Sequence, residues 1–134
     1  MENMIWIDSS VLINHYKEKN KTNTVFYSLV EKYEQLYISV VTEYEILIGA
    51  RSETQVSYWK NVFSDFFILN YISAINEVAI NTSLSLIPKG LNIEFKDLII
   101  ASTALYNKMP LATLNEKHFI NIPGLQLITS PSLL

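Results

Sequence analysis

The stretch "MIWIDSSVLINHYKEK", residues 4–19, decides how the chain begins to fold, because an apolar run ends there at one aspartate, Asp8. Ile5–Ile7 is rich in strand-forming residues, and the two serines after Asp8 are residues that commonly start helices. Apolar residues then recur at helical spacing up to Tyr16. The stretch therefore predicts a strand that leads directly into a helix. It leaves open whether Asp8 only caps that helix or is held there for chemistry.

Strand-like and helical patterns alternate along the rest of the chain. The apolar spacing predicts helices over 22–35, 42–49, 53–64, 73–87 and 94–109, and strands over 35–41, 66–71, 111–114 and 125–129. Strands that alternate with helices need crossover connections, so we expect an α/β fold around a mainly parallel sheet. Ligands of open parallel sheets bind beyond the carboxyl ends of the strands. Polar residues at those ends are therefore the candidates for function.

Length and composition limit the kind of site that this chain can build. The 134 residues fit one domain, which we predict over 1–134. Cysteine is absent, which excludes disulfides, thiolate metal sites and cysteine nucleophiles. Two histidines are too few for a histidine metal cage, so any metal site uses oxygen ligands, which favours Mg²⁺ or Mn²⁺. The net charge of −3 gives no general sign of nucleic-acid binding, although positive charge can be local.

Nothing in the sequence indicates a membrane segment. No uninterrupted apolar run approaches the length of a membrane span, and Glu2 with Asn3 argues against a signal peptide. We therefore expect a soluble, cytoplasmic protein with no membrane contact.

Four polar side chains stand next to buried apolar stretches. Asp8 ends the first predicted strand, Glu45 and Asp97 lie in the first turns of predicted helices, and Asn115 follows the strand 111–114. If the predicted topology holds, all four map to one edge of the sheet. Three carboxylates that converge there repel one another, by ~4 kcal/mol per pair at ~4 Å with an effective dielectric of ~20. A divalent cation turns that repulsion into binding, so convergence favours an Mg²⁺ site.

Each of these residues also has an ordinary structural explanation. Asp8 can be a helix N-cap, which is worth about 1 kcal/mol. Thr42 and Glu45 have the spacing of a capping box, in which each side chain satisfies a backbone donor near the other. Asp97 in a first helical turn gains about 0.3–1 kcal/mol from the helix dipole. Asn115 is a common turn residue.

Four segments in order resemble the motifs of the PIN-domain ribonucleases, specifically the single-domain VapC-like toxins of toxin–antitoxin pairs. The segments are "IWIDSSVLIN" with Asp8, "ISVVTEYEILIGA" with Glu45, "FKDLIIASTAL" with Asp97 and "PLATLNEKHF" with Asn115. The second motif aligns Glu45 and not Glu43. Each motif alone is weak, but four in order with fitting separations cover nearly the whole chain.

The resemblance implies a three-layer fold with a central, mainly parallel sheet of four to five strands flanked by helices. It also implies an Mg²⁺- or Mn²⁺-dependent endoribonuclease, the toxin of a type II toxin–antitoxin pair, in which Asp8, Glu45 and Asp97 hold the metal. Asn115 would orient water or a carboxylate, and cleavage would leave a 5′-phosphate and a 3′-hydroxyl. The implied partners are RNA, a cognate antitoxin whose amphipathic segment binds near the first helices, and a second copy of the chain.

Two other functions share features with this sequence. Many relatives carry a fourth acid where this chain has Asn115, so a degenerate module that binds RNA or protein without cleaving is an alternative. A haloacid-dehalogenase-like phosphatase also starts with an aspartate after a strand, but it needs a second aspartate two residues later. Ser10 occupies that position here, which excludes this reading.

Several polar residues near the motifs have more than one explanation. Lys96, next to the third motif aspartate, and Arg51 are placed to meet a phosphate near the site. The lysines within 17–21 either contact RNA or, the better explanation, solvate a loop. His118 serves as an acid or base or, more in keeping with its position, packs or caps. Ser9 either bonds into the site or caps the first helix.

Overall fold

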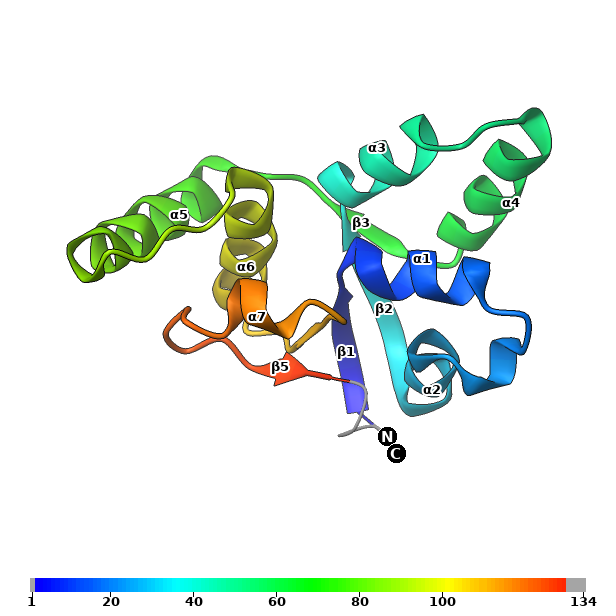
Figure 1. The fold of residues 1–134 in the computed structure, drawn as a ribbon, viewed down its shortest axis with the longest axis horizontal. Coiled ribbons are helices and arrows are strands. Elements are labelled where there is room, and N and C mark those ends of the chain that lie inside the picture. The colour runs from blue at the N-terminus through cyan, green and yellow to red at the C-terminus, as the bar shows by residue number, and fades with distance from the viewer. Residues whose placement is uncertain (1, 130–134) are drawn as a thin grey trace.

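Five strands form one sheet within residues 2–129, the part of the chain that the computed structural model describes. The strand order is β3-β2-β1-β4-β5, and every neighbouring pair is parallel (Figure 1). The strands are β1 (Glu2–Ile7), β2 (Tyr33–Ser39), β3 (Phe67–Leu69), β4 (Leu111–Ala112) and β5 (Leu127–Ile128). The α-helices are α1 (Ser9–Lys17), α2 (Val25–Lys32), α3 (Val40–Ile48), α4 (Glu53–Phe63), α5 (Ser73–Leu86), α6 (Phe95–Asn107) and α7 (Glu116–Phe119).

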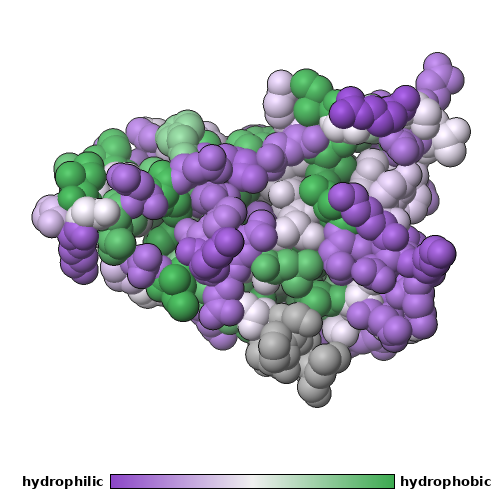
Figure 2. Space-filling view, viewed as in Figure 1, coloured by the Kyte–Doolittle hydropathy of each residue, from purple (hydrophilic) through white to green (hydrophobic). Residues whose placement is uncertain are grey.

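Helices cover both faces of the sheet, which gives three layers (Figure 1). Successive side chains of a strand point to opposite faces, and β1 follows this rule. Ile5 and Ile7 pack in the core beneath α1–α4, whereas Trp6 packs in the core beneath α6 and α7. Helix α5 packs against α6, away from the sheet, and apolar residues gather on its exposed surface (Figures 1 and 2). These layers confirm the predicted α/β fold.

The second predicted helix, 22–35, is too long in both directions. Helix α2 spans Val25–Lys32, and Tyr33 already belongs to β2, where it is 5% exposed and packs in the first core. Tyr33 fits the helical spacing of the preceding apolar residues although it belongs to the strand. A short apolar pattern does not distinguish a buried strand residue from a buried helix residue.

The third predicted helix begins at Val40 and not at Thr42. The Oγ of Ser39 accepts the backbone N–H of Val41 at 3.0 Å, so Ser39 is the N-cap. The strand predicted over 35–41 correspondingly ends at Ser39. A hydroxyl at the strand end therefore stops the strand two residues earlier than the run of valines suggested.

Two contacts position the elements that carry the candidate residues. The indole Nε1 of Trp6 donates to the carbonyl of Ile100 at 2.9 Å inside the core, which ties α6 to β1. The backbone N–H of Asp8 donates to the carbonyl of Ala112 at 3.0 Å, which aligns the ends of β1 and β4. Among the described residues, no helix has both the length and the apolar character needed to cross a bilayer.

Candidate functional site

Asp8 lies at the carboxyl end of β1 and is only 3% exposed. Two hydroxyls converge on its Oδ2: Ser10 Oγ donates at 2.7 Å and Thr113 Oγ1 donates at 2.8 Å. Thr113 reaches Asp8 because the parallel pairing of β1 with β4 places it directly beside the strand end. The backbone N–H of Leu114 in turn donates to Ser10 Oγ at 3.0 Å. The fold therefore holds this buried carboxylate in one orientation.

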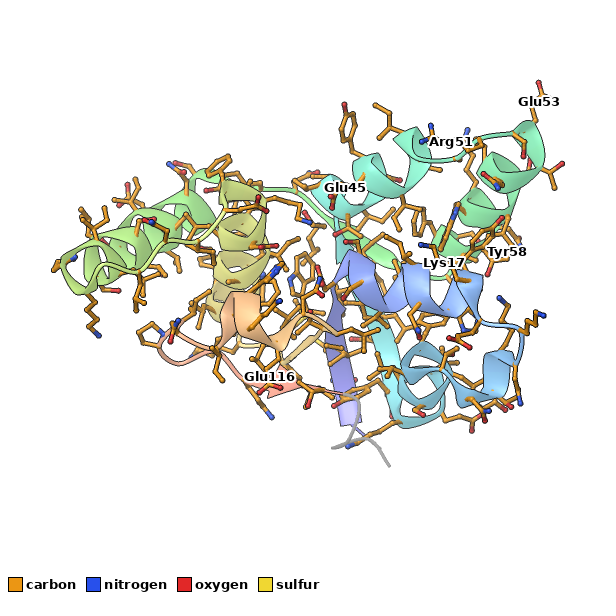
Figure 3. All side chains as sticks on the ribbon, viewed as in Figure 1. Lys17, Glu45, Arg51, Glu53, Tyr58 and Glu116 are labelled. Atoms are coloured by element: carbon orange, nitrogen blue, oxygen red, sulfur yellow. The ribbon has the colours of Figure 1, made fainter. Side chains whose placement is uncertain are left out.

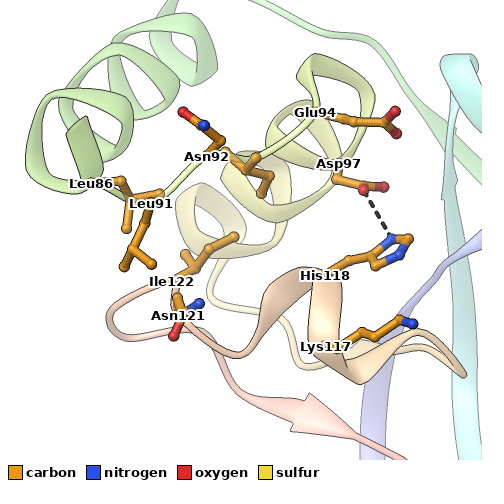
Figure 4. A pocket seen from close by; sticks show the side chains of 10 residues that line it. Leu86, Leu91, Asn92, Glu94, Asp97, Lys117, His118, Asn121 and Ile122 are labelled. Carbon is orange, nitrogen blue, oxygen red and sulfur yellow. Dashed lines mark ion pairs between the residues drawn. The ribbon is translucent and has the colours of Figure 1, made fainter. Parts of the chain in front are cut away.

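Asp97 lies in the first turn of α6 and is 4% exposed. The Nζ of Lys96 is 3.9 Å from Oδ1 of Asp97 and 3.3 Å from Oε2 of Glu45, which comes from α3. The Nδ1 of His118, from α7, is 3.1 Å from Oδ2 of Asp97 (Figure 4). The ammonium of Lys96 therefore bridges an acid of α3 and an acid of α6.

The pKa values indicate that these groups act on one another. Burial raises the pKa of Asp97, Lys96 and His118 oppose that rise, and the nearby charge of Asp8 adds to it. Burial by itself lowers the pKa of Lys96, but Glu45, Asp97 and Asp8 outweigh it, so the net pKa of Lys96 is raised. The three predicted acids and Lys96 thus form one electrostatic unit.

The four predicted residues do not all meet at one point. Within residues 2–129, no three Asp, Glu or His side chains lie close enough together to share a metal ion. Asn115 is exposed, and it is its backbone N–H that reaches the site, donating to Thr113 Oγ1 at 3.0 Å. The structure therefore links Glu45 and Asp97 through Lys96 and places Asp8 near enough to act on Asp97 and Lys96 only through its charge. It shows no contact of the Asn115 side chain that supports the predicted role.

The capping explanations fail for two of the acids. Asp8 occupies the N-cap position of α1, but its side chain makes no capping hydrogen bond. Thr42 and Glu45 do not form a capping box because the helix begins at Val40, and the Oγ1 of Thr42 is buried without a hydrogen-bond partner. Asp97 does lie in the first turn of α6, as predicted, and the N-cap of that helix is Glu94. Neither Asp8 nor Glu45 is therefore explained by helix capping.

Sequence reasoning missed or misassigned three residues of this site. Ser10, and not Ser9, bonds to Asp8. Thr113 was not singled out, although it begins the "TLN" of the fourth motif. His118 was expected to pack or cap but instead pairs with Asp97. The motif threonine was a signal that could have been used, whereas the position of His118 depends on α7, a single helical turn that is too short to show periodicity.

A cavity of about 280 Å³ opens beside Glu45, between α1, α3 and α4. Arg51 and Lys17 lie at its rim (Figure 3). Its apolar lining comes from Ile13, Tyr16, Ile46 and Trp59. This cavity is hereafter the α1–α4 groove, which has a mainly apolar lining with Lys17, Glu45 and Arg51 around it.

Comparison with known proteins identifies the family. The model of the PIN domain matches residues 5–125. "Ribonuclease VapC1" of Methanocaldococcus jannaschii is 33% identical over 121 residues, which cover 88% of this chain and 80% of the relative. "Ribonuclease VapC" of Rickettsia bellii is 30% identical over 137 residues, covering 93% and 95% of the two chains.

Two solved structures share the fold. DNA-bound VapBC from Salmonella typhimurium superposes with a TM-score of 0.84 at 22% identity, covering 97% of this chain and 99% of that one. VapBC-1 from nontypeable Haemophilus influenzae gives a TM-score of 0.83 at 22% identity, covering 96% and 98%. The residues matched by the family model include both Asp8, which follows β1, and Asp97 in α6. The solved neighbours share the fold of a parallel sheet between two layers of helices. The chain belongs to the PIN-domain family.

Proposed function

We propose that this protein is an endoribonuclease that depends on Mg²⁺ or Mn²⁺ and acts as the toxin of a toxin–antitoxin pair. Asp8, Glu45 and Asp97 hold the metal, and Asn115 assists from the rim. The observation that carries the proposal is the pair of aspartates buried at adjoining ends of β1 and α6, 3% and 4% exposed. Two relatives at 30–33% identity carry the name ribonuclease VapC, which supports the same activity.

The donor set suits a hard divalent cation. All three acids offer carboxylate oxygens, the ligands that Mg²⁺ and Mn²⁺ prefer. Two of these acids already hold a cation, since the ammonium of Lys96 bridges Glu45 and Asp97. Lys96 must leave Glu45 before the acids can close around an ion. When bound, the ion supplies Lewis-acid polarisation of the phosphodiester and activation of a water molecule.

The residues of the chain itself position the reacting groups. Ser10 and Thr113 fix the carboxylate of Asp8 from one side, so its orientation does not depend on the ion. Once displaced from Glu45, the ammonium of Lys96 is available to a phosphate oxygen of RNA, because its stem is anchored beside Asp97 in α6. His118 holds the other side of the Asp97 carboxylate.

The α1–α4 groove is the proposed site for the antitoxin. An amphipathic helix places an apolar face into such a groove and its charges at the rim. The solved neighbours described above are VapBC complexes, which supports a partner protein of this kind. A second copy of the chain is the other proposed partner, since Ile80 and Leu84 of α5 are large, apolar and exposed.

The test is cleavage of total RNA by purified, antitoxin-free protein with Mg²⁺ or Mn²⁺. Wild type should cleave, EDTA should abolish cleavage, and Asp8→Asn and Asp97→Asn should each lose it. Asp65→Asn is the matched control, because Asp65 is the remaining aspartate, is exposed and takes no part in the ion pairs of the site described above. If wild type binds RNA with either ion but does not cleave it, the degenerate binding module is favoured instead, the alternative that rests on Asn115 in place of a fourth acid.

A further inference from the structure

A second cavity, of about 320 Å³, adjoins the acidic site and shares two of its residues, Asp97 and His118. It lies between the segment that leads into α6 and the end of α7 (Figure 4). Its volume is in the range of small-ligand sites, ~300–1,000 Å³. Nothing in the acid and hydroxyl contacts described above requires this cavity.

The lining of this cavity combines an apolar floor with amide groups. The floor is aliphatic and comes from Leu86, Leu91, Ile93 and Ile122. Two exposed asparagines, Asn92 and Asn121, lie at the rim on opposite sides (Figure 4). Each carboxamide offers two N–H donors and one acceptor oxygen. The cavity therefore suits a flat, apolar ring with hydrogen-bonding groups on its edge.

The ionisable side chains that line the cavity include both acids and bases. Glu94 and Asp97 stand on the side that faces α6, and Lys117 and His118 stand on the side of α7 (Figure 4). An uncharged ring fits among groups of both signs without an unbalanced charge of its own. The ammonium of Lys117 is available to a neighbouring phosphate.

We infer that this cavity is a nucleobase subsite, which receives the base of a nucleotide next to the phosphate that is cleaved, with Asn92 and Asn121 reading the base edge. The inference rests on the proposed function for the identity of the substrate. Unstacked bases of single-stranded RNA are recognised by packing against side chains and by hydrogen bonds to their edges. The shared Asp97 fixes the register, since a base in the cavity and a phosphate at Asp97 belong to adjoining parts of one strand.

The first arm of the test measures binding without metal or cleavage. Wild-type protein in EDTA is titrated with AMP, CMP, GMP and UMP, and with ribose 5-phosphate as the probe that lacks a base. At least one nucleotide should bind more tightly than ribose 5-phosphate. Asn92→Ala or Asn121→Ala should weaken that binding about five-fold or more, the discrimination expected of a good amide–base contact. Asn61→Ala, an exposed asparagine of α4 on the opposite layer, should have no effect.

The second arm compares the bases that flank the cleavage sites in RNA cut by wild type and by the two asparagine variants. A changed base preference in variants that melt at the same temperature as wild type supports the subsite. Unchanged preference and equal binding of all five probes by wild type overturn it, while the ribonuclease proposal stands. If no RNA is cleaved but base-dependent binding is lost in the asparagine variants, the ribonuclease proposal fails and the base subsite survives.

Discussion

The hydroxyl of Thr113 offers the sharpest test of how the site is held. Thr113 is fully buried, and its Oγ1 donates to Oδ2 of Asp8 at 2.8 Å. Thr113→Val keeps the shape of the side chain and removes the hydroxyl, so the carboxylate of Asp8 keeps Ser10 as its remaining hydroxyl donor among the contacts described here. The variant should therefore lower the stability of the metal-free protein.

The size of this effect follows from the charge of the acceptor. A hydrogen bond to a charged group contributes ~1.5–3 kcal/mol. The entropy of unfolding is ~2.1 cal/mol/K per residue, or ~0.28 kcal/mol/K for the 134 residues of this chain. The melting temperature should therefore fall by ~5–11 °C. The lost acceptor for the N–H of Asn115 adds little, because Asn115 is exposed and water can replace it.

The assay is differential scanning calorimetry in EDTA, with Thr103→Val as the matched control. Thr103 is equally buried, but its Oγ1 bonds to the backbone carbonyl of Ile99 within the same helix, a neutral contact. The cost should be clearly larger at Thr113 than at Thr103, and it should shrink in an Asp8→Asn background, where the acceptor is uncharged. Equal losses of stability at both threonines, or an undiminished loss at Thr113 in the Asp8→Asn background, would show that the bond to a charged carboxylate is not the cause.

Three further predictions test separate features. Lys96→Gln removes the ammonium that competes with a metal ion for Glu45. Because a partly exposed ion pair is worth ~1 kcal/mol, Mn²⁺ should bind about five-fold more tightly to the variant in a calorimetric titration without RNA. Weaker Mn²⁺ binding by the variant would contradict this competition. Thr42→Val replaces a buried hydroxyl that has no partner, so the melting temperature should stay level or rise, and a clear fall would reveal a contact that matters. Burial, with a smaller contribution from Lys21, lowers the pKa of His15 below its ordinary 6.5, so this residue stabilises the fold above that pH and the benefit is lost as pH falls through the lowered value. His15→Gln should therefore lose less stability than wild type when the buffer is changed from about pH 7.5 to pH 5, and parallel losses count against it.

Most helices and strands could be predicted from the sequence because their signals lie in neighbouring residues. The strand at Ile5–Ile7 and the helix after it follow from neighbouring residues alone, as does the stop of α5 at Pro88 and Gly90. The boundary at Tyr33 was missed because its burial comes from pairing with a strand thirty residues earlier, which no local pattern records.

The sequence predicted the acids of the candidate site but not the hydrogen bonds and ion pairs that surround them. Asp8, Glu45 and Asp97 were predicted from their places at a strand end or in a first helical turn and from the order of the motifs. Their neighbours depend on long-range register: Thr113 meets Asp8 only because β4 pairs beside β1, 105 positions away in sequence. The bridge through Lys96 depends on how α3 approaches α6, which is a property of the assembled layers and not of either segment.

Metal-dependent hydrolysis of RNA directed by Asp8 leaves a chemical mark on the ends of the fragments. These ends can be read by mass spectrometry of RNA fragments made in Mn²⁺ by wild type, Asp8→Asn and the exposed control Asp65→Asn. We expect 5′-phosphate and 3′-hydroxyl ends from wild type and Asp65→Asn, and no fragments from Asp8→Asn or in EDTA. Fragments that persist in Asp8→Asn, or that end in 2′,3′-cyclic phosphate, would contradict metal-dependent hydrolysis directed by Asp8.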